Sequence, residues 1–158
     1  MSISDIMSRC VAECTEDTGI EKVYELIRKC EHGIVVVIDS EAHRVPIGVV
    51  TERSICEQLI VRGKSLRGLT AGSVLDSRIM LVREAAGIDN IASDKLDSLT
   101  AIIVTNDARR VTGIVPASSL RGVVTTLDAT RSPGAIYVST NVRRSPAARE
   151  IPAFGWIQ

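Results

Sequence analysis

The sequence predicts an α+β fold of two tandem βαββα modules, each with a small mixed sheet flanked by helices. Two observations carry this prediction: one segment of the chain recurs further along, and each copy places a β-branched apolar run between stretches of helical spacing. With 158 residues, 45% of them hydrophobic, the chain can bury the core of one domain or of two small domains packed together.

The repeat is visible in three pairs of segments. Residues 18–23 match 86–91 at a spacing of 86 − 18 = 68, residues 42–45 match 108–111 at 108 − 42 = 66, and residues 48–50 match 113–115 at 113 − 48 = 65. The spacing shrinks where we expect a helix end and a hairpin loop, positions that tolerate short deletions. Both copies should therefore contain the same elements in the same order.

The first copy opens with helical spacing after an acidic stretch at 16–18, and it continues with a β-branched run. Its expected elements are a helix from residue 20, a strand at 34–38, a turn at 39–41, a returning strand at 45–50 and a helix at 51–61 with Ile55, Leu59 and Ile60 on one face. Arg62 and Gly63 should end this helix, because glycine is a favourable C-terminal cap.

The second copy is shorter. Its expected elements are a helix at 87–94, a strand at 101–104, a turn at 105–107, a strand at 111–115 and a helix at 118–125. Since one such unit cannot bury both faces of its sheet, the two should pack on each other. We expect a first module at 1–66, a degenerate second module at 67–126 and a C-terminal tail at 127–158.

Composition argues against several classes of protein. The formal net charge of +0 and the 3% aromatic content argue against nucleic-acid binding. No apolar run approaches the roughly 20 residues that span a bilayer, and the first residues lack a secretion signal, so we expect a cytoplasmic protein without membrane contact.

Catalytic and metal-binding patterns are also missing from the sequence. The four cysteines form no Cys-x-x-Cys pair and the two histidines add no spaced partners, so we assign no metal and expect small buried thiols in a reducing compartment. There is no nucleophile paired with a base, no Walker-type phosphate loop and no recognisable acid pair. The prediction is a non-enzymatic protein with no catalytic residues.

The order of five segments resembles the CBS (cystathionine β-synthase type) domain pair, or Bateman module, over about residues 2–126. The segments that carry the resemblance are 4–8, 18–20, 47–53, 62–66 and 69–75. The resemblance implies three-stranded sheets, a pseudo-twofold pair of modules and a homodimer. It also implies a cleft between the modules that binds AMP, ADP, ATP, S-adenosylmethionine or NAD as a regulatory ligand, in a stand-alone signal-transduction protein that regulates another protein.

The family's nucleotide pattern is Gly-x-x-Thr followed, after two intervening residues, by an Asp that binds the ribose hydroxyls. In the first copy Gly48 and Thr51 fit, but Ser54 stands at the Asp position. In the second copy the corresponding residues are Pro116 and Ser119. Losing a carboxylate removes about 1.5–3 kcal/mol of charged hydrogen bonding, on the order of ten- to a hundredfold in affinity.

Arginines near these positions are candidates for contact with a ligand phosphate. They are Arg53, Arg121 and Arg9, each of which could equally be a solvated or ion-paired surface residue. The ligand-binding prediction therefore comprises Gly48, Thr51, Arg53, Ser54, Ser119 and Arg121.

Several alternatives stay open at this point. Thr51 either contacts a ligand or only caps a helix. The apolar residues of the two closing helices, Ile55, Cys56, Leu59, Ile60, Leu120, Val123 and Val124, form either a dimer surface or intramolecular core. The tail either docks through Phe154 and Trp156 or is a partly ordered terminus. The protein is then either an adenosine-nucleotide sensor or an interaction scaffold that has lost nucleotide binding.

Overall fold

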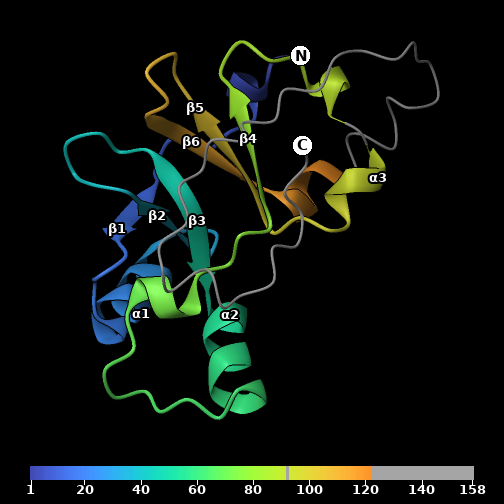
Figure 1. Ribbon diagram of the computed structural model, residues 1–158. Coiled ribbons are helices and arrows are strands. Elements are labelled where there is room, and N and C mark those ends of the chain that lie inside the picture. The colour runs from blue at the N-terminus through green and yellow to red at the C-terminus, as the bar shows by residue number, and fades with distance from the viewer. Residues whose placement is uncertain (92, 122–158) are drawn as a thin grey trace. The chain divides into compact units, whose positions relative to one another are not determined.

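The computed structural model describes residues 1–91 and 93–121 (Figure 1). Within these residues the chain forms two compact units, one made of residues 11–77 and the other of residues 1–10 and 78–121. Each unit contains one three-stranded sheet, with strand order β1-β2-β3 or β4-β5-β6. The predicted α+β fold with two small mixed sheets is confirmed. The expected tail, 127–158, lies outside the described residues.

The first sheet has β2 (Ile34–Ile38) at its centre. β2 pairs in parallel with β1 (Ala12–Thr15) and antiparallel with β3 (Pro46–Thr51), and α1 (Ile20–Lys29) connects the two parallel strands. All five residues of β2 are buried, which explains its uninterrupted β-branched sequence. The prediction of this strand was correct to the residue.

The core of this unit lies between one face of the sheet and its helices. Val23 and Ile27 of α1 pack with Val35, Val37 and other apolar residues of the sheet. Burial of each such side chain contributes about 1.5–3 kcal/mol. α1 is therefore held by its apolar stripe, while its last turn carries basic residues that suit a helix C-terminus.

α2 (Glu52–Cys56) follows directly from the end of β3 and continues as a π-helical turn, η2 (Glu57–Val61) (Figure 1). Ile55 and Leu59 pack on the core, the second of the two alternatives for this face, but Ile60 is 80% exposed. The prediction that Ile60 shares a face with Ile55 and Leu59 was wrong, because Ile60 lies in a π-helical turn, which holds more residues than an α-helical turn and changes their positions around the axis. Gly63 follows with φ +62°, as expected for the glycine that ends this helix.

The second sheet repeats this topology with different connections. β5 (Ala101–Thr105) pairs in parallel with β4 (Ile79–Arg83) and antiparallel with β6 (Val111–Pro116). Two short pieces, the 3₁₀ helix η4 (Ile88–Asn90) and α3 (Ser93–Leu96), replace the single helix found between the first two strands. The expected continuous helix at 87–94 was therefore wrong, although Gly87 caps η4 as Gly19 caps α1.

The two hairpin loops contain the same kind of hydrogen bond, from a backbone N–H to a side-chain oxygen. The Asp39 carboxylate accepts a hydrogen bond from the Val45 N–H at 2.9 Å, and the Asn106 side-chain carbonyl accepts one from the Arg110 N–H at 3.0 Å. Val45 is thus equivalent to Arg110, and Pro46, not Val45, is equivalent to Val111. The alignment of residues 42–45 with 108–111 was displaced by one position, because the second loop is two residues shorter.

One compact unit combines two separate stretches of sequence, residues 1–10 and 78–121, while the other is the continuous stretch 11–77. Asp76 exchanges two backbone hydrogen bonds with Val49 of β3, at 2.8 and 3.0 Å. Ser8 exchanges two with Ile114 of β6, at 2.9 and 3.0 Å. The segment that precedes each copy in sequence therefore pairs with the third strand of the other copy's sheet.

Glycines make this close approach possible. A Cβ added at Gly48 would lie 2.6 Å from Leu75 Cδ1 and 2.9 Å from the Asp76 carbonyl oxygen. A Cβ added at Gly113 would overlap the Met7 side chain. The repeated glycine of the two copies is thus required by packing.

The free cysteines differ in environment. Cys14 is buried, as expected, and desolvation raises the pKa of its thiol to about 12. Cys10 and Cys56 are exposed, so the expectation of buried thiols was wrong for both. Among residues 1–91 and 93–121, no helix is long and apolar enough to cross a membrane.

Candidate functional site

The candidate site lies where β3 runs into α2. Thr51 is the N-cap of α2, with extended backbone angles of φ −129° and ψ 166°. Its Oγ1 accepts a hydrogen bond from the Ser54 N–H at 3.2 Å. The capping interpretation of Thr51 is therefore correct, but this bond uses only an oxygen lone pair and leaves the hydroxyl proton able to meet a ligand.

Ser54, which occupies the family's Asp position, is 5% exposed, and its hydroxyl is hydrogen-bonded to the Thr51 backbone. Its hydroxyl donates to the Thr51 carbonyl oxygen at 2.9 Å and accepts from the Thr51 N–H at 3.0 Å. Because a serine hydroxyl has a single proton, Ser54 cannot donate to a ligand while its hydroxyl donates to the Thr51 carbonyl oxygen. Only one lone pair of Ser54 remains for a ribose hydroxyl.

Gly48 lies in the interior of β3, opposite Val37 of β2. Its missing side chain admits Leu75 and Asp76, so its role in the structure is packing. Asp76 is only 6% exposed and was not singled out from the sequence. The sequence carries no clear signal for it, because the polar residues Ser77 and Arg78 follow Asp76 directly.

The remaining predicted residues lie on the surface. Arg53 is exposed in the first turn of α2, and Ser119 is exposed in the helical segment 117–121, which follows Pro116. Arg121 in that segment is paired with Asp97 at 3.4 Å, and Arg9 is paired with Glu84 at 3.6 Å; all four side chains are substantially exposed. Such exposed pairs contribute little stability.

The structure brings together Gly48, Thr51, Arg53 and Ser54 within one strand and helix of a single unit. Ser119 and Arg121 belong to the other unit. In that unit the Ala117 N–H, which follows Pro116, donates to the Thr100 carbonyl oxygen at 3.2 Å. The first copy therefore retains more of the expected polar groups than the second.

Gln58 is a second polar residue that the sequence interpretation missed. It lies in η2, four residues after Ser54, and it is 4% exposed. Its Oε1 is the one buried side-chain nitrogen or oxygen atom of the described chain that has no hydrogen-bond partner. The signal in the sequence was a polar residue on the side of the helix that also carries Ser54.

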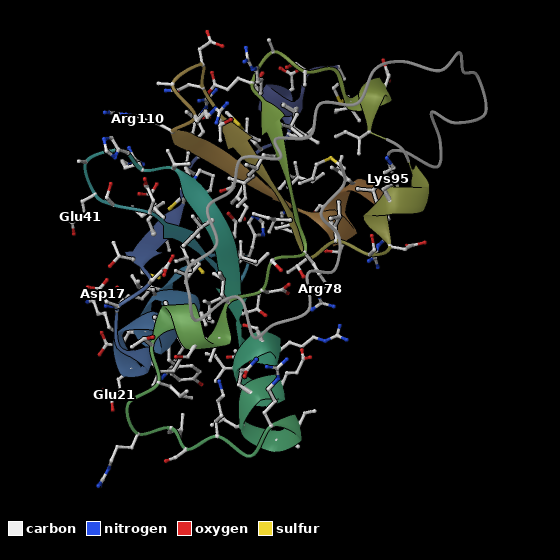
Figure 2. All side chains as sticks on the ribbon, in the orientation of Figure 1. Asp17, Glu21, Glu41, Arg78, Lys95 and Arg110 are labelled. Atoms are coloured by element: carbon white, nitrogen blue, oxygen red, sulfur yellow. The ribbon has the colours of Figure 1, made fainter. Side chains whose placement is uncertain are left out.

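Potential metal ligands are not clustered. Within residues 1–91 and 93–121 no group of three or more His, Cys, Asp or Glu side chains is arranged to hold an ion. Acidic and basic side chains at the surface, such as Glu41 at the first hairpin and Arg110 at the second, are directed away from the sheets (Figure 2).

Comparison with known proteins agrees with this architecture. The family model of the CBS domain matches residues 3–61. An uncharacterized protein of Methanocaldococcus jannaschii is 29% identical over 134 residues, which cover 80% of this chain but 30% of that protein. This chain thus spans about a third of the length of that relative.

Solved structures share the fold. A CBS domain protein of Pyrobaculum aerophilum, complexed with AMP, is similar with a TM-score of 0.67 and 20% identity, covering 82% of this chain and 100% of that one. The CBS domain pair of protein MJ0100, in complex with 5′-methylthioadenosine and S-adenosyl-L-methionine, has a TM-score of 0.61 and 18% identity, covering 80% and 98%. Residues 3–61 therefore match the CBS domain, and the chain has the fold of solved CBS-domain pairs.

Proposed function

We propose that this chain is a regulatory, non-enzymatic CBS protein that binds an adenosine-containing nucleotide at the Thr51 end of β3. The observation that carries the proposal is the junction of β3 and α2, where the Thr51 hydroxyl, the exposed Arg53 and the start of a helix occur together. The N–H groups of a first helical turn favour anionic groups, and an arginine suits a phosphate. AMP and S-adenosylmethionine in the similar solved structures support this ligand class.

Ligand binding would act on other proteins by shifting the population of two states, which requires different affinities for the two. We propose that the signal passes through a homodimer or partner surface. Exposed apolar side chains at the end of η2 and beyond it, Ile60, Val61 and Leu66, support a contact surface in this region. In this proposal the protein acts in the cytoplasm.

A second candidate function, an interaction scaffold without nucleotide binding, is favoured by one observation. The Ser54 hydroxyl is committed to the Thr51 backbone, and it lacks the charge and the second oxygen of a carboxylate. The residual affinity for a ribose would then be low.

A thermal-shift and calorimetric titration against AMP, ADP, ATP, S-adenosylmethionine and NAD separates the two functions. A nucleotide that binds the folded state must raise the melting temperature by mass action. We expect a saturable rise for at least one adenosine-containing compound. No response at millimolar concentration of any of the five would contradict sensing and support the scaffold.

A further inference from the structure

The polar residues of the helix that follows β3 lie along one side of it. Thr51, Ser54 and Gln58 are spaced by three and four residues, which places successive residues above one another on a helix. The side chains of Ser54 and Gln58 are both buried. A helix held only by apolar packing would carry apolar residues at these positions.

The polar groups along this side are not equally satisfied. Thr51 and Ser54 bond to each other through three hydrogen bonds. The Oε1 atom of Gln58 is closed to solvent and has no partner. Buried amide oxygens in native proteins nearly always have a donor, so an orphaned one indicates a missing partner. Because no bond holds this oxygen in place, rotation of the side chain towards a ligand sacrifices no hydrogen bond at that atom.

The backbone around Gln58 is also unusual. Gln58 lies in the π-helical turn Glu57–Val61, and π-helical turns within helices occur frequently at functional sites. Within this turn Gln58 is buried and Ile60 is exposed. The irregular turn and the orphaned oxygen thus occur at the same residue.

We propose that Gln58 is a specificity-determining residue that accepts a hydrogen bond from the 6-amino group of an adenine base. The inference rests on the proposed function and names the part of the ligand that is read. A glutamine amide offers an acceptor beside a donor, the arrangement that matches the amino group and ring nitrogen of adenine. Because the Ser54 hydroxyl is hydrogen-bonded to the Thr51 backbone, ligand recognition depends more on contacts with the base than on contacts with the ribose.

Calorimetric titration with two nucleotides tests this assignment. AMP carries the 6-amino group, and purine riboside 5′-monophosphate differs from it only by lacking that group. We expect the wild-type protein to bind AMP about tenfold more tightly. Gln58→Met, which keeps the length of the side chain, should bind both nucleotides equally and at the weaker level. Its melting temperature should be at or above that of the wild type, because the substitution removes an unsatisfied buried atom.

Glu57→Met is the matched control, since Glu57 is exposed in the same π-helical turn. This variant should keep the preference for AMP. If wild type and Gln58→Met bind AMP equally, or if the wild type does not distinguish the two nucleotides, the assignment of Gln58 is wrong while nucleotide binding stands. If the wild type binds neither nucleotide nor any other adenosine compound, the proposed function is wrong and this inference with it. Equal binding of the two nucleotides by the wild type contradicts the assignment even if Gln58→Met does not fold.

Discussion

The two strand-to-helix junctions of the repeat keep one backbone plan but differ in chemistry. β3 ends in Thr51, whose hydroxyl and backbone form a capping box with Ser54. β6 ends in Pro116, which offers neither a hydroxyl nor an N–H, and the next N–H is bonded to Thr100. The difference teaches that packing alone can preserve a repeated fold while the polar groups that could bind a ligand are kept in one copy only.

The largest expected effect concerns the glycine that the two copies share. Gly48→Ala should cost about 3 kcal/mol and Gly113→Ala about 1 kcal/mol, within the range for overpacked cores. The added Cβ at Gly48 meets the backbone oxygen of Asp76, which cannot move without breaking the pairing with Val49. At Gly113 it meets only the flexible Met7 side chain. Urea denaturation of both variants measures the difference, and equal costs would contradict this account.

An aspartate placed at the family's Asp position should raise the affinity for AMP at the first junction but not at the second. Ser54→Asp should tighten AMP binding on the order of ten- to a hundredfold, about 1.5–3 kcal/mol. An aspartate can still accept the Thr51 N–H, so the capping box is preserved. Ser119→Asp should have no comparable effect, because Pro116 contributes no hydroxyl. Calorimetry of both variants tests this, and an equal gain for Ser119→Asp would remove the distinction between the copies.

Removal of the cap should lower stability in the first copy only. Thr51→Ala should cost about 1 kcal/mol of unfolding free energy, since it leaves the Ser54 N–H without its acceptor. Thr51→Ser keeps the hydroxyl and should stay close to the wild type. Pro116→Ala, the counterpart in the second copy, removes no side-chain cap and should change stability by less than about 0.5 kcal/mol. Urea denaturation that gives Thr51→Ala and Pro116→Ala the same cost would show that the cap does not stabilise the first junction.

The smallest expected effect comes from the hairpins, in which Arg44 and Arg109 have φ values of +54° and +61°. Arg109→Gly should gain about 0.5–1 kcal/mol by relieving the left-handed conformation. Arg44→Gly should gain little, because it also loses the ion pair in which Arg44 Nε donates to Glu13 at 3.0 Å. Thermal denaturation should therefore rank Arg109→Gly above Arg44→Gly, and the reverse order would show that the Glu13 pair is not stabilising.

Sequence patterns identified the elements that have strong local signals. The run 34–38 and the helix after Gly19 were found because a buried strand and an amphipathic helix impose their own periodicity. The four-residue β1 has no comparable pattern, since Ala12, Glu13 and Thr15 are only half-buried on an edge strand. The sequence also did not predict that residues 1–10 pair with the second sheet or that residues 69–76 pair with the first sheet. Such pairings depend on contacts between residues that are far apart in the sequence.

The strand-to-helix junction that carries the proposed site was predictable from the sequence, but its hydrogen bonds were not. Thr51 and Ser54 were found because the strand, the turn into a helix and the Gly-x-x-Thr spacing are all local. That the Ser54 hydroxyl is engaged by the Thr51 backbone follows from rotamers, which the sequence does not specify. The proposed role of Gln58 rests on a π-helical turn and an unpartnered atom, and neither has a reliable sequence signal.

The central claim, that nucleotide binds at the Thr51 junction and not at its counterpart, is tested most directly by calorimetric titration of AMP. The proteins to compare are the wild type, Thr51→Val and Ser119→Ala. We predict saturable binding to the wild type, about fivefold to tenfold weaker binding to folded Thr51→Val through loss of the hydroxyl, and unchanged binding to Ser119→Ala. Unchanged binding to Thr51→Val together with weakened binding to Ser119→Ala would contradict the account.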